Sequence, residues 1–369
     1  MANNVTLHQK NKDGAYDNIY PRTTADHTML TSATGNKYGL TDGNAEQVVS
    51  ISMDFISTIG AISIYVFDPL GNPVEGAVIQ GLSGNPSTNA SGFVQGTVVD
   101  NPVTVKSPYV DLKDKSVNVT SYVGTTTAMR VTLESLGENG IVRFTRSTNV
   151  KFSPATKTID VCCVGGGGGG GPAATYEPST NEMIGNGAGG GGGGIVSSYG
   201  ITVSSNTSYP LIIGNGGSAA NAGGATTFLT VSAPGGTGGS ISGEYPNTNA
   251  VAGIAGIDGC GNGGRYSAGG SNTTVSEFND GKTFYSGGGG AGVGERLVTE
   301  NKKFKGGSPN GASGAIAGYD VTAKAGTAGI GGGGGGAAYY SNSSGSTINH
   351  DIRAGSGGSG LVAIRIHLK

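Results

Sequence analysis

Between residues 46 and 135, apolar and polar side chains alternate in short segments. Val49, Ile51, Met53 and Phe55 are separated by polar residues, and the same two-residue period recurs at positions 62–66, 103–105, 117–119 and 129–133. Successive side chains of a β-strand point to opposite faces, so this period predicts strands with one buried face. Several short strands at this spacing predict a small antiparallel β-sandwich, which we place at residues 46–138.

Turn-forming residues separate these strands. The segment DPLGNPVEGAV at residues 68–78 and the segment NASGFV at residues 89–94 combine proline, glycine and asparagine in the order that tight turns require. Together they resemble the carboxypeptidase-regulatory-like, transthyretin-like sandwich of seven strands. That resemblance implies a non-catalytic spacer or binding domain, and it transfers no active-site residue to this chain.

Glycine dominates the second half of the chain. Of its 73 glycines, most follow residue 164, and unbroken runs occupy Gly165–Gly171, Gly189–Gly194 and Gly331–Gly336. A flexible linker is one interpretation, but apolar strand-like pieces at residues 159–163 and 195–203 border the runs, which favours an ordered fold. Without Cβ atoms, extended polyproline II-like runs pack side by side and exchange backbone hydrogen bonds. The structural positions that we expect in these packed polyglycine II-like runs are Gly165, Gly168, Gly171, Gly190, Gly193, Gly331 and Gly334.

Two apolar strands flank the glycine-rich region, at residues 157–164 and 361–368, and we expect them to share one core. Between them the segments VCCV with its glycines, YPLIIGNGG, GGATTF, SAPGG and GGSGLVAIR follow one another. In that order they resemble the glycine-rich domain of bacteriophage tail fibres. The resemblance defines a third domain at residues 139–369.

The tail-fibre resemblance implies that variable loops between the glycine runs contact a host receptor. The corresponding loops are residues 172–184, 241–258, 295–305 and 337–353. Large aromatic residues in such loops supply contact area at low entropic cost. The candidate receptor-binding residues are Tyr176, Tyr245, Phe304, Tyr339 and Tyr340. An alternative is that these rings cap the glycine core.

Residues 1–45 are polar and rich in turn formers, with no helical or strand period. The segment NKDGAYDNIYPRTTAD at residues 11–26 resembles the N-terminal stretch of phage tail-associated and fibre proteins, where it is thought to seat the chain on the virion. We therefore predict an extended docking arm that binds other virion proteins.

Charge and cysteine content exclude several classes of protein. The 369 residues carry a formal net charge of −2, and 12% are charged, which gives no electrostatic case for nucleic acid or anionic membrane as partners. No apolar stretch approaches the roughly 20 residues that span a bilayer, and the start lacks signal-peptide features, so we expect a soluble, unexported chain without membrane insertion. Three cysteines, with Cys162 and Cys163 adjacent, fit neither a disulfide framework nor a zinc site and are expected to be small buried hydrophobes.

Sequence matches to catalytic and cofactor-binding motifs lack the flanking residues that those motifs require. Residues 185–190 read GNGAGG, which satisfies G-x-G-x-x-G, and residues 281–283 end like a P-loop, but neither lies between a strand and a helical pattern. Asp100 and Asp111 have no acidic partner at a recognisable spacing, and the four histidines are scattered, so we interpret them as surface residues. We expect no cofactor, no metal and no catalytic residue.

These observations predict an all-β protein with an N-terminal arm, a sandwich and a glycine-rich domain. The favoured function is a non-enzymatic virion structural protein of a bacteriophage, part of a tail fibre or baseplate, which attaches to a receptor or glycan on the host surface. It would be assembled in the bacterial cytoplasm as a homo-oligomer, with a trimer favoured. A capsid fibre or decoration protein is one alternative, and a tail-borne polysaccharide depolymerase is another, since the fold could assemble a carboxylate pair that the sequence does not reveal.

Overall fold

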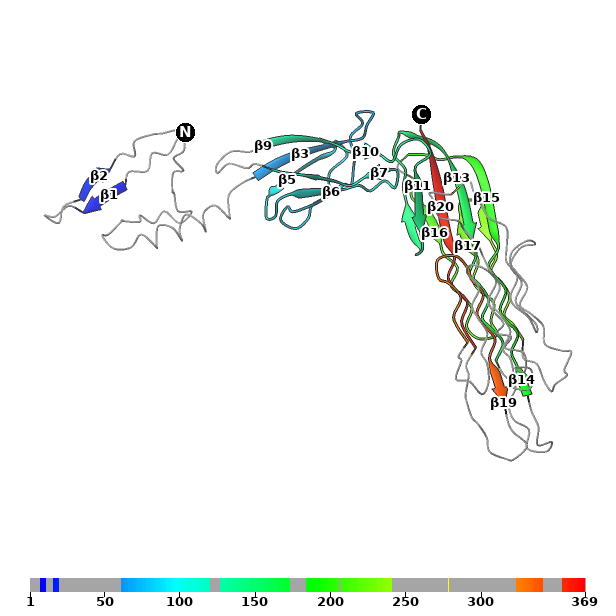
Figure 1. Ribbon diagram of the computed structural model, residues 1–369. Coiled ribbons are helices and arrows are strands. Elements are labelled where there is room, and N and C mark those ends of the chain that lie inside the picture. The colour runs from blue at the N-terminus through cyan, green and yellow to red at the C-terminus, as the bar shows by residue number, and fades with distance from the viewer. Residues whose placement is uncertain are drawn as a thin grey trace. The chain divides into compact units, whose positions relative to one another are not determined.

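The computed structural model describes residues 7–10, 16–19, 61–119, 127–172, 184–205, 207–240, 278, 323–340 and 354–368. Every regular element in these ranges is a β-strand, which confirms the predicted all-β class (Figure 1). The chain divides into two compact units, Met1–Pro108 with Leu112–Ser135, and Tyr109–Asp111 with Leu136–Lys369.

The first unit contains a short hairpin near its start. Strand β1 (Leu7–Lys10) pairs antiparallel with β2 (Tyr16–Ile19). The hydrophobic pattern predicted no strand in this part of the arm. The hairpin is therefore an addition to the sequence-based prediction.

Two three-stranded sheets form the body of the first unit. In one, β3 (Ala61–Phe67) lies between β5 (Phe93–Thr97) and β9 (Thr127–Thr132); in the other, β6 (Val103–Lys106) lies between β4 (Val78–Gln80) and β8 (Lys115–Val117). A small two-stranded sheet joins β7 (Leu112–Lys113) to β10 (Glu134–Ser135). The buried core takes one face of each sheet and includes the fully buried Ile62, Ile64, Val66, Ile79, Val103 and Val105. The predicted periods at 62–66, 103–105, 117–119 and 129–133 fall on or beside these strands, and the predicted strand at 49–55 lies outside the described residues.

One pairing departs from the antiparallel pattern. Strands β3 and β9 run parallel, with Tyr65 opposite Arg130. The chain makes the other sheet between these two strands, so β9 returns to β3 by a long connection, as parallel neighbours require. The predicted turns fall where expected: the Asp68 carboxylate accepts hydrogen bonds from the backbone N–H groups of Leu70 and Asn72, and Asn89 does the same for Ser91 and Phe93.

Two four-stranded sheets form one end of the second unit. The first has the order β11 (Ile141–Phe144), β20 (Leu361–Leu368), β13 (Thr156–Val164) and β15 (Ile195–Thr202); the second has the order β12 (Thr148–Val150), β16 (Tyr209–Ile212), β17 (Thr226–Phe228) and β18 (Val231–Ala233). Strands β13 and β20 pair along almost their whole length, which confirms that the first and last strands of this region share a core. Between the sheets pack Ile159, Val161, Cys163, Leu211, Phe228, Val231, Val362, Ile364 and Ile366.

The opposite face of the first sheet has a smaller core. Cys162, Val164, Leu361 and Ala363 pack there against Phe278, whose side chain is fully buried. Phe278 belongs to a part of the chain that follows residue 240. Phe278 therefore covers part of this face of the sheet.

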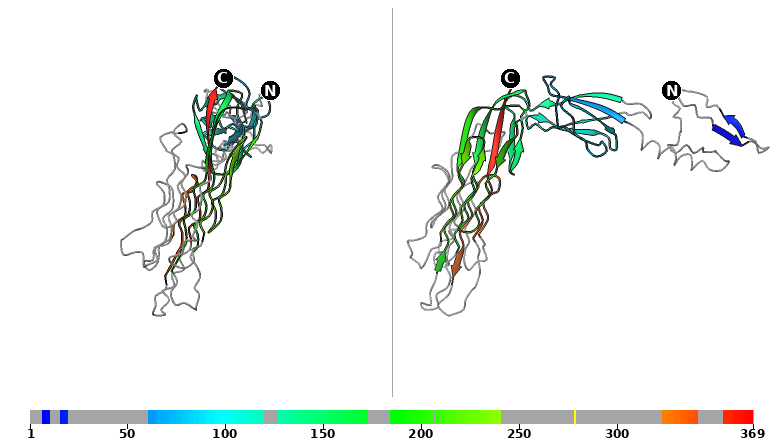
Figure 2. Two further views of the ribbon diagram at one scale, coloured as in Figure 1. Left: turned by 90° about the vertical axis from the view of Figure 1, so that its right-hand side faces the viewer. Right: turned by 180° about the vertical axis from the view of Figure 1, so that it is seen from behind.

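Extended glycine-rich runs lead away from the sheets (Figures 1 and 2). Their hydrogen bonds show that residues 165–171, 214–218, 234–240 and 331–337 run outward, whereas residues 187–194, 221–225, 324–329 and 355–360 return. At the far end β14 (Ile184–Asn186) pairs antiparallel with β19 (Ala338–Tyr340). The packing of these runs confirms the predicted polyglycine II-like architecture.

Candidate functional site: a glycine bundle and an ionic network at its base

The extended glycine-rich runs pack into a bundle, and the run at residues 165–171 lies at its centre. Its N–H groups point to three different neighbouring runs in turn, so that every third N–H donates to one and the same neighbour, as expected for a helix of three residues per turn. The donors Gly165, Gly168 and Gly171 bind the carbonyls of Gly194, Gly191 and Ala188; Gly166 and Gly169 bind those of Gly224 and Asn221; Gly167 and Gly170 bind those of Gly358 and Gly355, all at 2.7–2.9 Å.

The carbonyl groups of the same run reach three further neighbours. The carbonyls of Gly166 and Gly169 accept from the N–H groups of Gly236 and Gly239. Those of Gly167 and Gly170 accept from Gly217 and Ala220, and those of Gly168 and Gly171 accept from Gly334 and Ala337. The three runs that accept hydrogen bonds return toward the sheets, whereas the three that donate run outward. The central run therefore has six neighbouring runs, which bind all seven of its N–H groups and the carbonyls of residues 166–171.

This packing requires glycine along the whole central run. A Cβ added at any residue from 165 to 171 would overlap a backbone carbonyl of a neighbouring run, and all seven residues are buried. The same holds at the other predicted structural positions. At Gly165, Gly168 and Gly171 an added Cβ would meet the carbonyl oxygens of Pro234, Thr237 and Ser240, respectively. At Gly190 and Gly193 it would meet those of Gly168 and Gly165, and at Gly331 and Gly334 those of Gly165 and Gly355.

Two of the outer runs have glycine at two of every three positions instead. In residues 234–240 the buried positions are Gly236 and Gly239, while Pro234 and Thr237 are exposed. Residues 355–359 repeat this pattern, with Gly355 and Gly358 buried and Ser356 exposed. A period of three thus separates the packed side of an outer run from its solvent side, where a side chain fits.

The far end of the bundle is where the longer connections depart. Run 165–171 ends beside Ser240 and Ala337, so residues 172, 184, 240 and 340 all lie toward this end. Of the five candidate receptor-binding residues, Tyr339 and Tyr340 lie in β19, opposite Gly185 and Ile184. The prediction of a loop throughout 337–353 is therefore wrong at Ala338–Tyr340, where cross-strand pairing with β14 makes a short strand. Tyr176, Tyr245 and Phe304 lie outside the described residues.

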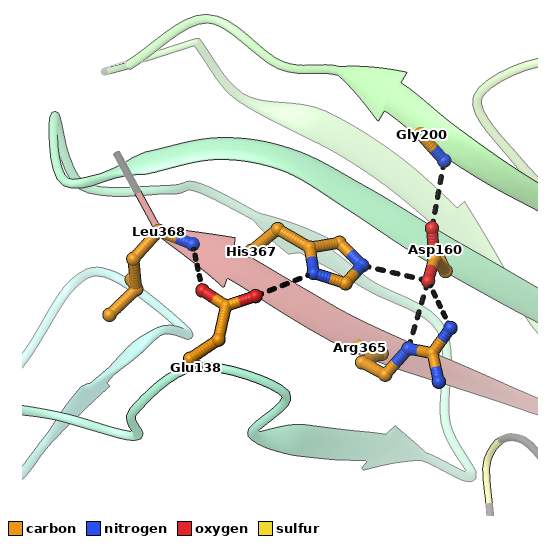
Figure 3. A network of polar contacts seen from close by, with 6 residues as sticks. All are labelled: Glu138, Asp160, Gly200, Arg365, His367 and Leu368. Atoms are coloured by element: carbon orange, nitrogen blue, oxygen red, sulfur yellow. Dashed lines mark hydrogen bonds and ion pairs between the residues drawn. The ribbon is translucent and has the colours of Figure 1, made fainter.

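At the base of the bundle, His367 joins two carboxylates (Figure 3). Its Nδ1 lies 2.8 Å from Glu138 Oε1, and its Nε2 lies 2.8 Å from Asp160 Oδ2. Asp160 Oδ2 also accepts a hydrogen bond from Arg365 Nε at 2.8 Å, and Asp160 Oδ1 accepts one from the Gly200 N–H at 2.7 Å. The Leu368 N–H donates to Glu138 Oε2 at 2.8 Å.

A β-bulge positions Asp160 in this network. The register of β13 against β15 shifts between Ile159 and Val161, so two residues of β15 face Asp160. One of them is Gly200, with a φ of 64° that glycine adopts without strain. The bulge turns the Gly200 N–H toward the buried carboxylate.

The network perturbs all three titratable groups. Hydrogen bonds to Asp160 and then Glu138 raise the pKa of His367, which favours an imidazolium that donates from both ring nitrogens. Burial acts to raise the pKa of Asp160, but hydrogen bonds from His367, Gly200 and Arg365 outweigh it and the pKa is lowered. The Leu368 N–H, followed by His367, lowers the pKa of Glu138. An imidazole held in this way has no nitrogen left to accept a proton, so the arrangement suits an electrostatic clamp between β13 and β20 and not general-base catalysis.

The surface assignment of Asp111 is wrong, and His367 is less exposed than expected. His367 is only partly exposed because it lies between Glu138 and Asp160. Asp111 is fully buried, since its carboxylate accepts hydrogen bonds from the Ser153 backbone N–H and from the Ser153 and Thr156 hydroxyl groups. No local motif signals either cluster, because the partners lie 42–45 residues apart for Asp111 and more than 200 apart for His367.

The remaining candidate motifs have structural explanations. Residues 184–194 pass from β14 directly into an extended run, so the G-x-G-x-x-G match meets no helix. Cys162 and Cys163 are buried in the two cores, and burial, with a contribution from Cys162, raises the pKa of Cys163 to about 12. Residues 281–283 lie outside the described ranges. Within those ranges, histidine, cysteine and acidic side chains form no group that could hold a metal ion, and no helix has the length and apolarity of a membrane span.

The second unit coincides with a known family. The family described as glycine-rich domain matches residues 144–367, which is more than half of the chain. The chain belongs to the glycine-rich domain family. The match begins at the end of β11 and ends in β20, so the glycine-rich domain comprises the bundle, most of its two basal sheets and the His367–Asp160 contact. No curated protein matches the sequence.

Proposed function

We propose that this protein is a non-enzymatic virion protein of a bacteriophage that attaches the particle to its host. In this proposal it belongs to a tail fibre or the baseplate, binds other virion proteins through residues 1–45, and contacts a surface receptor or glycan with the connections at the far end of the bundle. The favoured assembly is a homo-oligomer.

One observation carries the proposal: the bundle is a scaffold built almost wholly from backbone, and its longer connections depart from one end. Residues 172, 184, 240 and 340, which border these connections, all lie toward that end. Loops carried at one end of a rigid scaffold are the arrangement that many recognition surfaces share. A capsid fibre would use the same arrangement, and its position on the particle would distinguish it.

The test is a cell-binding assay with the purified full-length chain. Tyr339 and Tyr340 replaced together by Ser should weaken binding to a susceptible bacterial strain by about tenfold or more if either residue is a hot spot. Replacing Ile212, which is exposed at the sheet end, by Ser is the matched control and should leave binding unchanged. Equal cell binding by the parent and the double variant would remove β19 from the contact surface, and a lack of binding to every strain tested would contradict the attachment function.

A further inference from the structure

The outward face of the sheet β5–β3–β9 in the first unit carries a row of aromatic and cationic side chains. Tyr65 of the central strand pairs with Phe93 on one side and with Arg130 on the other. Inward positions of the same strands, such as Ile64 and Val66, are fully buried, so Tyr65 points away from the core. Tyr65 is 40% exposed although it lies on the middle strand.

The members of this row hold one another in place. The ring centroids of Tyr65 and Phe93 are 5.0 Å apart, with 45° between the ring planes. The Arg130 guanidinium carbon lies 4.1 Å from the centroid of the Phe67 ring. Stacking on an aromatic face fixes the plane of a guanidinium while its N–H groups still point outward along that plane. The row therefore offers rigid rings beside an oriented cation.

The charge on this face has one sign. Among the outward residues of the three described strands, Arg130 is the one charged side chain, and its neighbours are aromatic, small or uncharged polar residues such as Gln95 and Thr132. An anionic group would thus meet a cation with no carboxylate among the outward residues of β5, β3 and β9, although the whole chain carries a net charge of −2.

We propose that this face binds an acidic polysaccharide whose sugar rings carry carboxylates. Tyr65 and Phe93 would pack against the C–H face of a pyranose ring, Arg130 would bind the carboxylate through two N–H groups, and Gln95 would hydrogen-bond a hydroxyl group. This site belongs to the first unit, and it does not depend on the attachment function proposed above.

The experiment measures binding of the full-length protein to a purified uronic-acid oligosaccharide, oligogalacturonate, by titration calorimetry. The carboxyl-reduced oligosaccharide is the matched ligand without charge. We expect wild-type protein to bind the uronate at least about tenfold more tightly than the reduced ligand, and Arg130→Gln to remove that preference. Tyr65→Ala should weaken binding of both ligands, whereas Leu70→Ala, an exposed apolar residue in the 68–73 turn, should change neither.

Several results would overturn the proposal. Undetectable binding of oligogalacturonate by wild-type protein would do so, as would equal affinity for the reduced ligand. A concentration-dependent dimer that Tyr65→Ala abolishes would assign the face to a second copy of the chain instead. Thermal melts of each variant, together with the Leu70→Ala control, separate loss of binding from loss of fold.

Discussion

His367 Nε2 lies 2.8 Å from Asp160 Oδ2, which joins the last strand of the chain to a residue 207 positions earlier. The two residues lie at the base of the glycine bundle, on neighbouring strands β20 and β13. The central glycine run continues directly from β13, and the last outer run enters β20 directly. The contact therefore clamps the two strands that anchor the middle and one side of the bundle.

The first prediction concerns pH. The folded-state pKa of His367 is raised, so its stabilisation is complete below the unfolded value of about 6.5 and is lost as pH rises through the folded value. The pKa values of Asp160 and Glu138 are lowered, so their stabilisation is present above about 4 and is lost as pH falls through the folded values. The difference in melting temperature between wild-type protein and His367→Gln should thus be larger at pH 6 than at pH 9. A difference that is constant across this range would show that the imidazolium does not contribute.

The second prediction ranks the two carboxylates. Asp160→Asn should destabilise the second unit by about 3 kcal/mol, because it removes the charge from a buried acceptor shared by Arg365, His367 and Gly200. Glu138→Gln is the matched change at an exposed carboxylate and should cost clearly less, because solvent screens its contacts. Denaturant unfolding of both variants measures the ranking, and equal losses would mean that burial of Asp160 is unimportant.

The third prediction tests the period of three within a single outer run. Gly358→Ala places a Cβ against the Thr327 carbonyl oxygen and should cost about 3 kcal/mol or more, since both partners are backbone. Ser356→Ala, at the exposed position two residues earlier, should change stability by no more than about 0.5 kcal/mol. If both variants melted alike, the run would not be packed in this register.

Much of the fold follows from patterns that are local in the sequence. Alternation marks β3, β6 and β20, turn residues mark the Asp68 and Asn89 turns, and unbroken glycine marks the runs that have no room for a Cβ. No local pattern indicates the parallel pairing of β3 with β9, because alternation identifies a strand but not the strand with which it pairs. The same reason explains β19, whose pairing with β14 joins residues about 150 positions apart.

The ionic network could not be predicted for a different reason. Glu138, Asp160 and His367 are three ordinary polar residues in sequence. They meet because β20 pairs with β13 on one side and with β11 on the other, and because the bulge at Gly200 faces Asp160. The glycine runs show the opposite case. Their composition predicts packing, but which run lies at the centre depends on hydrogen bonds between segments up to about 190 residues apart.

Amide hydrogen exchange of Gly165–Gly171 tests most directly the claim that this run is the core of the bundle. All seven N–H groups are hydrogen-bonded and buried, so they should be among the slowest in the protein and exchange only by global unfolding of the second unit. The N–H groups of Ser218 and Ala219, two exposed residues of the turn that follows Gly217, provide the internal comparison and should exchange faster. Exchange of Gly165–Gly171 at the rate of an unstructured glycine peptide would contradict the packed core and restore the flexible-linker interpretation.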